Sequence, residues 1–384
     1  MKPRGAEARL ILLSAAPASR RADAGAQMQE LCAEADWERL QAMLGARRLL
    51  ALLGERILAA GGGLAPAQFA QAVERAKQDA RRHGQFLQLL AARVTSALTN
   101  AGIASLLLKG PALGELLYGD AGYRQGSDVD VLVAPEDLSQ AIALAVGLGY
   151  EPPDDPLARD GLPQLHCTLS HADGLLPDLE LHWRVHWYER SFATDMLRRS
   201  SRAEDGTREP TAIDGFVSLL LYYARDGFVD VRLLADLVAW WERFQAELHP
   251  GSLDQTVREY PALRRALLAA LLAAESLTGA PMRNLISQPA RIELRVRLAA
   301  RLANPNPRQS LTQLHADVAL VDWLLSPPAG QTEFIRRQLL ISTDVLEYRA
   351  RRAQREQIGT PLGHGIRVLA RNLLAMPRLL RRAR

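Results

Sequence analysis

Cysteine is almost absent from this chain of 384 residues. The two that occur, Cys32 and Cys167, are far apart and lack the short spacing of metal-binding pairs. The sequence therefore predicts no disulfide framework, and it favours a reducing, cytoplasmic location.

The N-terminus offers an alternative to that location. It begins with basic residues and has a short apolar run, residues 10–18, as secretory signals do. Charged residues lie just before this run, and Arg20 and Arg21 follow it closely. We therefore favour a cytoplasmic protein in which residues 1–25 form a flexible N-terminus.

Long apolar runs, aromatic residues and a strong net charge are also missing. No stretch reaches the ~18 consecutive apolar residues that a membrane span requires. The formal net charge is only +4, so composition does not indicate nucleic acid as a partner. Aromatic residues make up 5% of the chain, while Ala, Leu and Arg dominate and favour helices. A hydrophobic content of 48% is typical of a globular protein with a large core.

The C-terminal segment leaves a peripheral membrane contact open. Residues 365–384 read "GIRVLARNLLAMPRLLRRAR", which combines apolar residues with many arginines as interfacial helices do. A solvated terminal helix is the alternative interpretation.

Apolar spacing divides the chain into a helical region, a compact α/β region and a second helical region. Helical periodicity runs through residues 26–102 and includes one long helix that begins after the glycines at 61–63. Residues 103–212 contain short apolar runs with a period of two, including a hairpin around "HADGLLP". Helical patterns return in 213–384, and they predict the following helices: 214–247, 254–279, 287–303, 310–325, 331–357 and 363–383.

Two carboxylates interrupt a strand that otherwise reads as buried. The stretch "RQGSDVDVLV" at 124–133 places Asp128 and Asp130 two residues apart. Side chains at i and i+2 of a strand face the same way, with Cα atoms about 6.5–7 Å apart. Two uncompensated buried carboxylates would be costly, so a cation is expected between them. An oxygen-only ligand set suits Mg²⁺ or Mn²⁺ and not zinc.

A second strand repeats this period. In "PDLELHW", Asp178, Glu180 and His182 share one face, and Leu179 and Leu181 lie on the other. A third carboxylate from a neighbouring strand would complete a site for two divalent ions, which together stabilise the attacking and leaving oxygens of a phosphoryl displacement.

A strand-to-helix junction precedes the two aspartates. The stretch "LLLKGP" ends an apolar run at Lys109 and Gly110, and a short helix begins at the proline. Backbone N–H groups and the helix N-terminus at such a junction can meet phosphate oxygens.

Together these motifs resemble the uncharacterised nucleotidyltransferase family of the polymerase β-like superfamily. The resemblance is carried by "LLLKG" (106–110), "LYGDAGYR" (117–124), "SDVDVLV" (127–133) and "LELHW" (179–183). It implies an α+β fold in which a small mixed β-sheet is flanked by N-terminal and C-terminal helical regions. It also implies a metal-bound NTP as the nucleotide donor.

The resemblance further implies roles for individual residues. Asp128, Asp130 and Glu180 are expected to be catalytic metal ligands for Mg²⁺ or Mn²⁺. The nucleotide is expected to contact Lys109, Gly110, Arg124 and Ser127. The acceptor is not specified by the family and could be a small molecule, a glycan or a peptide.

Several assignments keep an alternative. Asp178 could replace Glu180 as the third carboxylate. Arg124 could pair with Asp120 or Glu115 and leave the phosphates free. His182 is expected to orient a carboxylate or contact substrate, because convergence with His186 on zinc would need a helix where the pattern indicates a strand.

Two wider expectations complete the sequence-based hypothesis. The whole chain could be a catalytically degenerate nucleotide-binding protein or a scaffold at the membrane surface. For an active enzyme, we expect Asp130→Asn to abolish transfer. We also expect this variant to keep or raise metal-free stability, because it separates like charges.

Overall fold

The computed structural model describes residues 5–153, 165–202, 208–287, 292–303 and 311–330. The helices predicted at 331–357 and 363–383, and with them the basic C-terminal segment, lie outside the described residues. Among the described residues, no helix combines the length and apolar character that crossing a membrane would require.

A four-stranded mixed sheet forms the centre of the α/β region. Its strands lie in the order β1 (Ser105–Leu107), β2 (Asp128–Val133), β4 (Asp178–His182) and β3 (His166–Leu169). Strands β2 and β4 are parallel, and the other two pairs are antiparallel. The predicted hairpin is the β3–β4 pair. The small mixed sheet, and the α+β fold with flanking helices, are confirmed.

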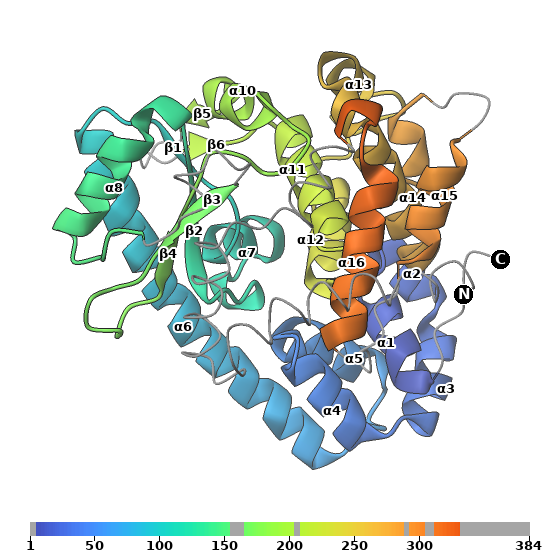
Figure 1. The fold of residues 1–384 in the computed structure, drawn as a ribbon. Coiled ribbons are helices and arrows are strands. Elements are labelled where there is room, and N and C mark those ends of the chain that lie inside the picture. Colours follow the sequence, from blue (N-terminus) through green and yellow to red (C-terminus); the bar gives the residue numbers. More distant parts are fainter. Residues whose placement is uncertain (1–4, 154–164, 203–207, 288–291, 304–310, 331–384) are drawn as a thin grey trace.

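The two faces of the sheet pack against different helices (Figure 1). Valines 129, 131 and 133 of β2 belong to an apolar cluster with α6 (Ala67–Asn100) and α8 (Leu138–Gly147). The opposite face carries Asp128, Asp130 and Leu132, and Leu132 packs into the core of the C-terminal helices. The period-two prediction for this strand is therefore confirmed.

The loop before β2 is anchored to the long helix α6. After β1, the chain forms α7 (Pro111–Tyr118) and the 3₁₀ turn Ala121–Tyr123. Gly122 of this turn lies so close to α6 that an added Cβ would stand 2.7 Å from the backbone nitrogen of Arg81. Only glycine permits this approach, which sets where β2 begins.

The described residues of the N-terminal segment are helical and packed, which differs from the flexible N-terminus predicted for residues 1–25. Residues 6–23 form two helices, and Leu10 and Ile11 pack in a core cluster with Met28 of the next helix. The apolar run that resembles a secretory signal is thus a buried helix face. The N-terminal elements are α1 (Ala6–Ser14), α2 (Ala18–Asp23), α3 (Gly25–Glu34), α4 (Trp37–Gly45), the π-helical turn Leu50–Gly54 and α5 (Glu55–Ala60).

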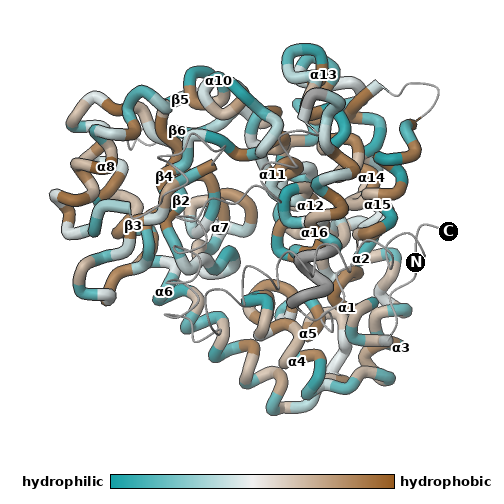
Figure 2. Tube along the Cα trace, viewed as in Figure 1, coloured by the Kyte–Doolittle hydropathy of each residue, from teal (hydrophilic) through white to brown (hydrophobic). Residues whose placement is uncertain are grey.

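The C-terminal region is a helical layer beside the sheet. Figure 2 shows hydrophobic residues along α11 and α14, whose side chains form the largest core cluster. One helix was predicted over 214–247, but the chain turns at Gly227 and Phe228, which both adopt positive φ. The elements are α10 (Phe192–Arg199), β5 (Ser201–Arg202), β6 (Arg208–Glu209), α11 (Ala212–Arg225), α12 (Val231–Arg243), α13 (Asp254–Glu259), α14 (Arg264–Thr278), α15 (Leu294–Arg301) and α16 (Leu311–Leu325).

Candidate active site

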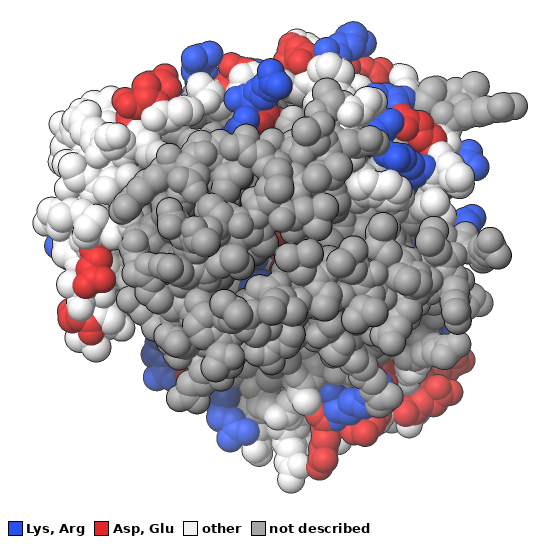
Figure 3. Space-filling model, viewed as in Figure 1, with Lys and Arg blue, Asp and Glu red and all other residues white. Residues whose placement is uncertain are grey.

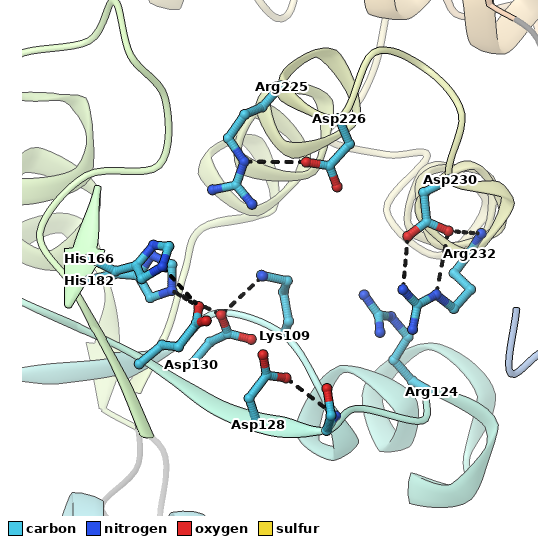
Figure 4. Close-up of polar contacts among 12 residues, drawn as sticks. Lys109, Arg124, Asp128, Asp130, His166, His182, Arg225, Asp226, Asp230 and Arg232 are labelled. Carbon is cyan, nitrogen blue, oxygen red and sulfur yellow. Dashed lines mark hydrogen bonds and ion pairs between the residues drawn. The ribbon is translucent and has the colours of Figure 1, made fainter. Parts of the chain in front are cut away.

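Three carboxylates meet on the sheet face that is turned toward α11. Parallel pairing sets Asp130 of β2 directly beside Glu180 of β4, and Asp128 lies on the same face two residues earlier. One oxygen from each of these three residues lies within 4.8 Å of the others, a separation that could hold a metal ion (Figure 4). The two strands thus bring the predicted carboxylates together.

Asp130 is buried and has two cationic or polar partners. Its Oδ1 accepts from Lys109 Nζ at 3.0 Å and from the Nε2–H of His182 at 2.9 Å. Burial alone would raise the pKa of Asp130, but Lys109 and His182 outweigh it and hold this pKa well below its usual range. Asp130 is therefore a firmly ionised carboxylate.

Asp128 lies in a different electrostatic environment. Burial, followed by the charges of Asp130 and Glu180, raises the pKa of its carboxyl group. The backbone N–H of Ser127 donates to its Oδ1 at 3.3 Å. The repulsion of the cluster on Asp128 is only partly offset by Lys109 and the Ser127 N–H, and a bound cation would relieve it further.

Two histidines line the other side of Glu180. His182 Nε2 lies 3.2 Å from Glu180 Oε2, and His166 Nε2 lies 3.6 Å from the same oxygen. Burial and the neighbouring His182 ring lower the pKa of His166 to about 4, so His166 is neutral at pH 7. His182 contacts both carboxylates, as expected of a residue that orients them.

His166 was not among the site residues predicted from the sequence. It faces His182 in the antiparallel β3–β4 pair, and the two ring centroids are 4.6 Å apart. The alternation of His166 with Thr168 in the hairpin could have indicated this once the strand register was known. Within the described part of the chain, the histidines that belong to a group able in its spacing to hold a metal ion are His166 and His182, and His186 is not in such a group.

Asp178 stands apart from the cluster. It pairs in register with Asp128 at the start of β4, where its side chain is exposed. The carboxylate group that could hold an ion contains Glu180 in its place. The geometry therefore favours Glu180 over Asp178 as the third carboxylate.

A cavity of about 130 Å³ lies beside the carboxylates. Lys109, Gly110 and Ser127, which were predicted to contact the nucleotide, line it together with the two aspartates of β2. Gly110 has φ of 79° directly before α7, in a region that favours glycine. The structure thus gathers these three predicted residues around one small, charged space.

Arg124 lines the same cavity but is engaged elsewhere. Its Nε donates to the buried Asp236 at 2.5 Å, and Tyr118 also donates to Asp236, at 2.8 Å. Asp120, one of its expected partners, pairs with Arg81. The main contact of Arg124 therefore ties the loop before β2 to α12.

A larger cavity of about 570 Å³ is also lined by Lys109. It also reaches Asp128 and Asp130, and most of its wall is apolar, with the following side chains: Leu107, Leu113, Leu116, Met196, Leu219 and Trp240. Asp128 and Asp130 thus line both a small charged cavity and a larger, mostly apolar one.

Comparison with protein families matches residues 33–278 to the uncharacterised nucleotidyltransferases. The chain belongs to this family. The match runs from α3 to the last residue of α14, so this nucleotidyltransferase unit includes the sheet and the helices on both of its faces. Comparisons with curated proteins and with solved structures gave no match.

Membership of the uncharacterised nucleotidyltransferases supports nucleotidyl transfer as the coarse function of this chain, which is thereby a transferase. The acidic cluster of β2 and β4 lies inside the matched region, and the spacing of its oxygens could hold a metal ion. The family resemblance expected from the four sequence motifs is confirmed.

Proposed function

We propose that this nucleotidyltransferase moves a nucleoside monophosphate from an NTP to a hydroxyl or similar group of an acceptor and releases pyrophosphate. The observation that carries the proposal is the cluster of Asp128, Asp130 and Glu180 beside a cavity lined by cationic side chains. In the reaction, the acceptor oxygen forms a bond to the α-phosphorus. The bond from that phosphorus to the β-phosphate bridging oxygen breaks, and pyrophosphate leaves.

The three carboxylates have the donor chemistry for Mg²⁺ or Mn²⁺. They offer oxygen ligands only, and like charges within 4.8 Å of one another favour a divalent cation between them. When bound there, such ions neutralise charge on the α-phosphate and the leaving group and lower the pKa of the acceptor hydroxyl.

Lys109 and His182 act on this cluster in different ways. His182 donates to both Asp130 and Glu180, so it positions the two carboxylates relative to each other. Lys109 has three N–H donors and directs one at Asp130, which leaves donor capacity for the β- and γ-phosphate oxygens. Gly110 and Ser127 line the same space, where backbone N–H groups can approach phosphate.

The acceptor is proposed to be a small molecule, a glycan or a peptide. The larger cavity is lined by Asp128 and Asp130 as well, and its largely apolar wall suits a carbon-rich group. On the face drawn in Figure 3, basic and acidic side chains lie beside one another around the described part of the surface. Among the described residues on this face, charges of mixed sign do not form the continuous basic patch that the polyanionic backbone of nucleic acid would favour.

The proposal is tested by label transfer from α-labelled NTP into a lysate of the source organism, with Mg²⁺ or Mn²⁺ present. Asp130→Asn and Glu180→Gln should each lower transfer by about 10²–10³-fold or more, because they remove transition-state charge stabilisation. Asp178→Asn, on the same strand, is the matched control and should keep transfer. Transfer that persists in the first two variants would refute the proposal.

Two further outcomes would change the proposed function or its residue roles. Loss of transfer in Asp178→Asn but not in Glu180→Gln would exchange the roles of these residues. Wild-type protein that binds NTP but transfers no label would support the alternative of a catalytically degenerate nucleotide-binding protein.

A further inference from the structure

Arg225, the last residue of α11, has unused hydrogen-bonding capacity. Its side chain is 16% exposed, and its Nε lies 3.4 Å from the carboxylate of its sequence neighbour Asp226. Its Nη1 is buried without a hydrogen-bond partner among the described residues. A buried N–H left without an acceptor is costly, so this donor is positioned for a ligand.

The guanidinium group lies close to the carboxylate cluster. Its Cζ is 4.8 Å from the centre of the Tyr222 ring, and Lys109 Nζ is 4.6 Å from the same centre. Lys109 in turn contacts Asp130. Figure 4 shows the Arg225 guanidinium directed toward the space between Lys109 and the His166–His182 pair.

The other arginines that line the small cavity are already engaged. Arg124 donates to Asp236, as described above. Arg232 donates to Asp230 from Nη2 at 3.1 Å, and its Nη1 lies 3.4 Å from the carbonyl oxygen of Gln125. Arg225 is thus the arginine of this wall, within the described residues, that keeps a buried donor free.

We propose that Arg225 binds the polyphosphate tail of the nucleotide and, after transfer, the pyrophosphate product. This assignment rests on the proposed nucleotidyl transfer and concerns a residue outside the four motifs at 106–110, 117–124, 127–133 and 179–183. A guanidinium presents its N–H groups as a planar fork that matches two phosphate oxygens. Stacking against Tyr222 keeps the fork oriented. Lys109 and Arg225, which both lie close to the Tyr222 ring, then hold the phosphates together.

The test measures binding of inorganic tripolyphosphate by calorimetry in the presence of Mg²⁺, so that no transfer is required. Arg225→Gln should weaken binding by about 10- to 100-fold, the loss expected for a charged hydrogen-bond donor. Arg225→Lys keeps the charge without the fork and should fall between the wild type and Arg225→Gln. Arg198→Gln is the matched control, because Arg198 also pairs with a nearby aspartate but is 70% exposed.

Thermal unfolding of each variant separates binding from folding. If Arg225→Gln does not fold, Arg225→Lys decides, and wild-type affinity in that variant would overturn the assignment. Wild-type affinity in a folded Arg225→Gln, or an equal loss in Arg198→Gln, would overturn it as well.

Failure of the Arg225 assignment can be distinguished from failure of the proposed nucleotidyl transfer. Label transfer that depends on Asp130 while Arg225→Gln binds tripolyphosphate normally would refute the role of Arg225 alone. Binding of tripolyphosphate that depends on Arg225, in a protein that transfers no label, would retain a polyphosphate site and refute the transferase.

Discussion

Neutralising Asp128 and neutralising Asp130 should change the metal-free stability of the fold in opposite directions. Asp130→Asn removes the charge that accepts hydrogen bonds from Lys109 and His182. Hydrogen bonds to charged groups contribute roughly 1.5–3 kcal/mol each, and the asparagine oxygen retains part of them. We expect Asp130→Asn to lower the free energy of unfolding by about 1–3 kcal/mol.

Asp128→Asn should instead stabilise the metal-free protein. Its carboxyl oxygen lies within 4.8 Å of oxygens on Asp130 and Glu180. Two unit charges about 5 Å apart repel by roughly 3 kcal/mol at an effective dielectric constant of ~20. Lys109 offsets part of this repulsion. A net gain of about 1–2 kcal/mol is therefore expected.

The pH dependence of the two effects differs in sign. The pKa of Asp128 is raised in the folded state, so its cost to stability appears as pH rises through that pKa. The gain in Asp128→Asn should thus be present at pH 7 and vanish below the unfolded pKa of about 3.9. The pKa of Asp130 is lowered, so its contribution exists above about pH 3.9 and is lost as pH falls through the folded value.

Thermal and denaturant unfolding in a metal chelator would measure these changes. Each kcal/mol should shift the thermal midpoint by about 1–3 °C for a chain of this size. Asp178→Asn is the control, because this exposed carboxylate should change stability by less than about 0.5 kcal/mol. Added Mg²⁺ or Mn²⁺ should stabilise the wild type, and both variants should lose that gain.

An Asp130→Asn variant as stable as the wild type would contradict a stabilising role for the contacts of Lys109 and His182 with Asp130. An Asp128→Asn variant less stable than the wild type would contradict the repulsion at Asp128. The first of these results is the one that the sequence predicted. Like charges two residues apart suggested repulsion at both positions. In the structure Lys109 and His182 both contact Asp130. The change in the free energy of unfolding expected for Asp130→Asn is therefore a loss and not a gain.

Two further variants test the packing around the site. Burial raises the pKa of Glu189 to about 7, so the folded protein binds an additional proton and loses stability as pH rises from about 4.5 to 7. Between pH 5 and pH 8, denaturant unfolding should show a stability change that is more unfavourable by roughly 1–3 kcal/mol in the wild type than in Glu189→Gln, because the opposite contribution of His166 is present in both; an equal change in both would contradict the assignment. Gly122→Ala should cost about 1–3 kcal/mol in denaturant unfolding, because its methyl group would meet the backbone of α6. Gly147→Ala, with open space at its Cβ in α8, should be neutral or slightly stabilising, and an equal loss there would remove the contact with α6 as the cause.

The local features of the site could be predicted from sequence because strands impose a period of two. That period placed Asp128 and Asp130 on one face and Glu180 with His182 on another strand. The junction at Gly110 was visible because a glycine and a proline mark the end of a strand and the start of a helix.

Long-range pairings could not be predicted in the same way. Lys109 contacts Asp130 because β1 and β2 are neighbours, and a residue pattern does not state which strands are adjacent. Arg225 reaches the site from α11, about a hundred residues after β2, through the packing of the helical layer. The packing of the N-terminal helices, predicted as a flexible segment, was missed for the same reason, since the packing partners of Leu10 and Ile11 lie in other helices.

The order of strands in the sheet has a consequence for folding. Strand β4 is the last of the four to leave the ribosome, yet it lies between β2 and β3. Until β4 is inserted, β3 has no strand to join, and the parallel pair must close a long segment of chain. The inserted strand also carries Glu180 and His182. Completion of the sheet and completion of the acidic cluster are therefore one event, so a partly folded chain cannot collect divalent ions through a finished cluster before its central sheet has formed.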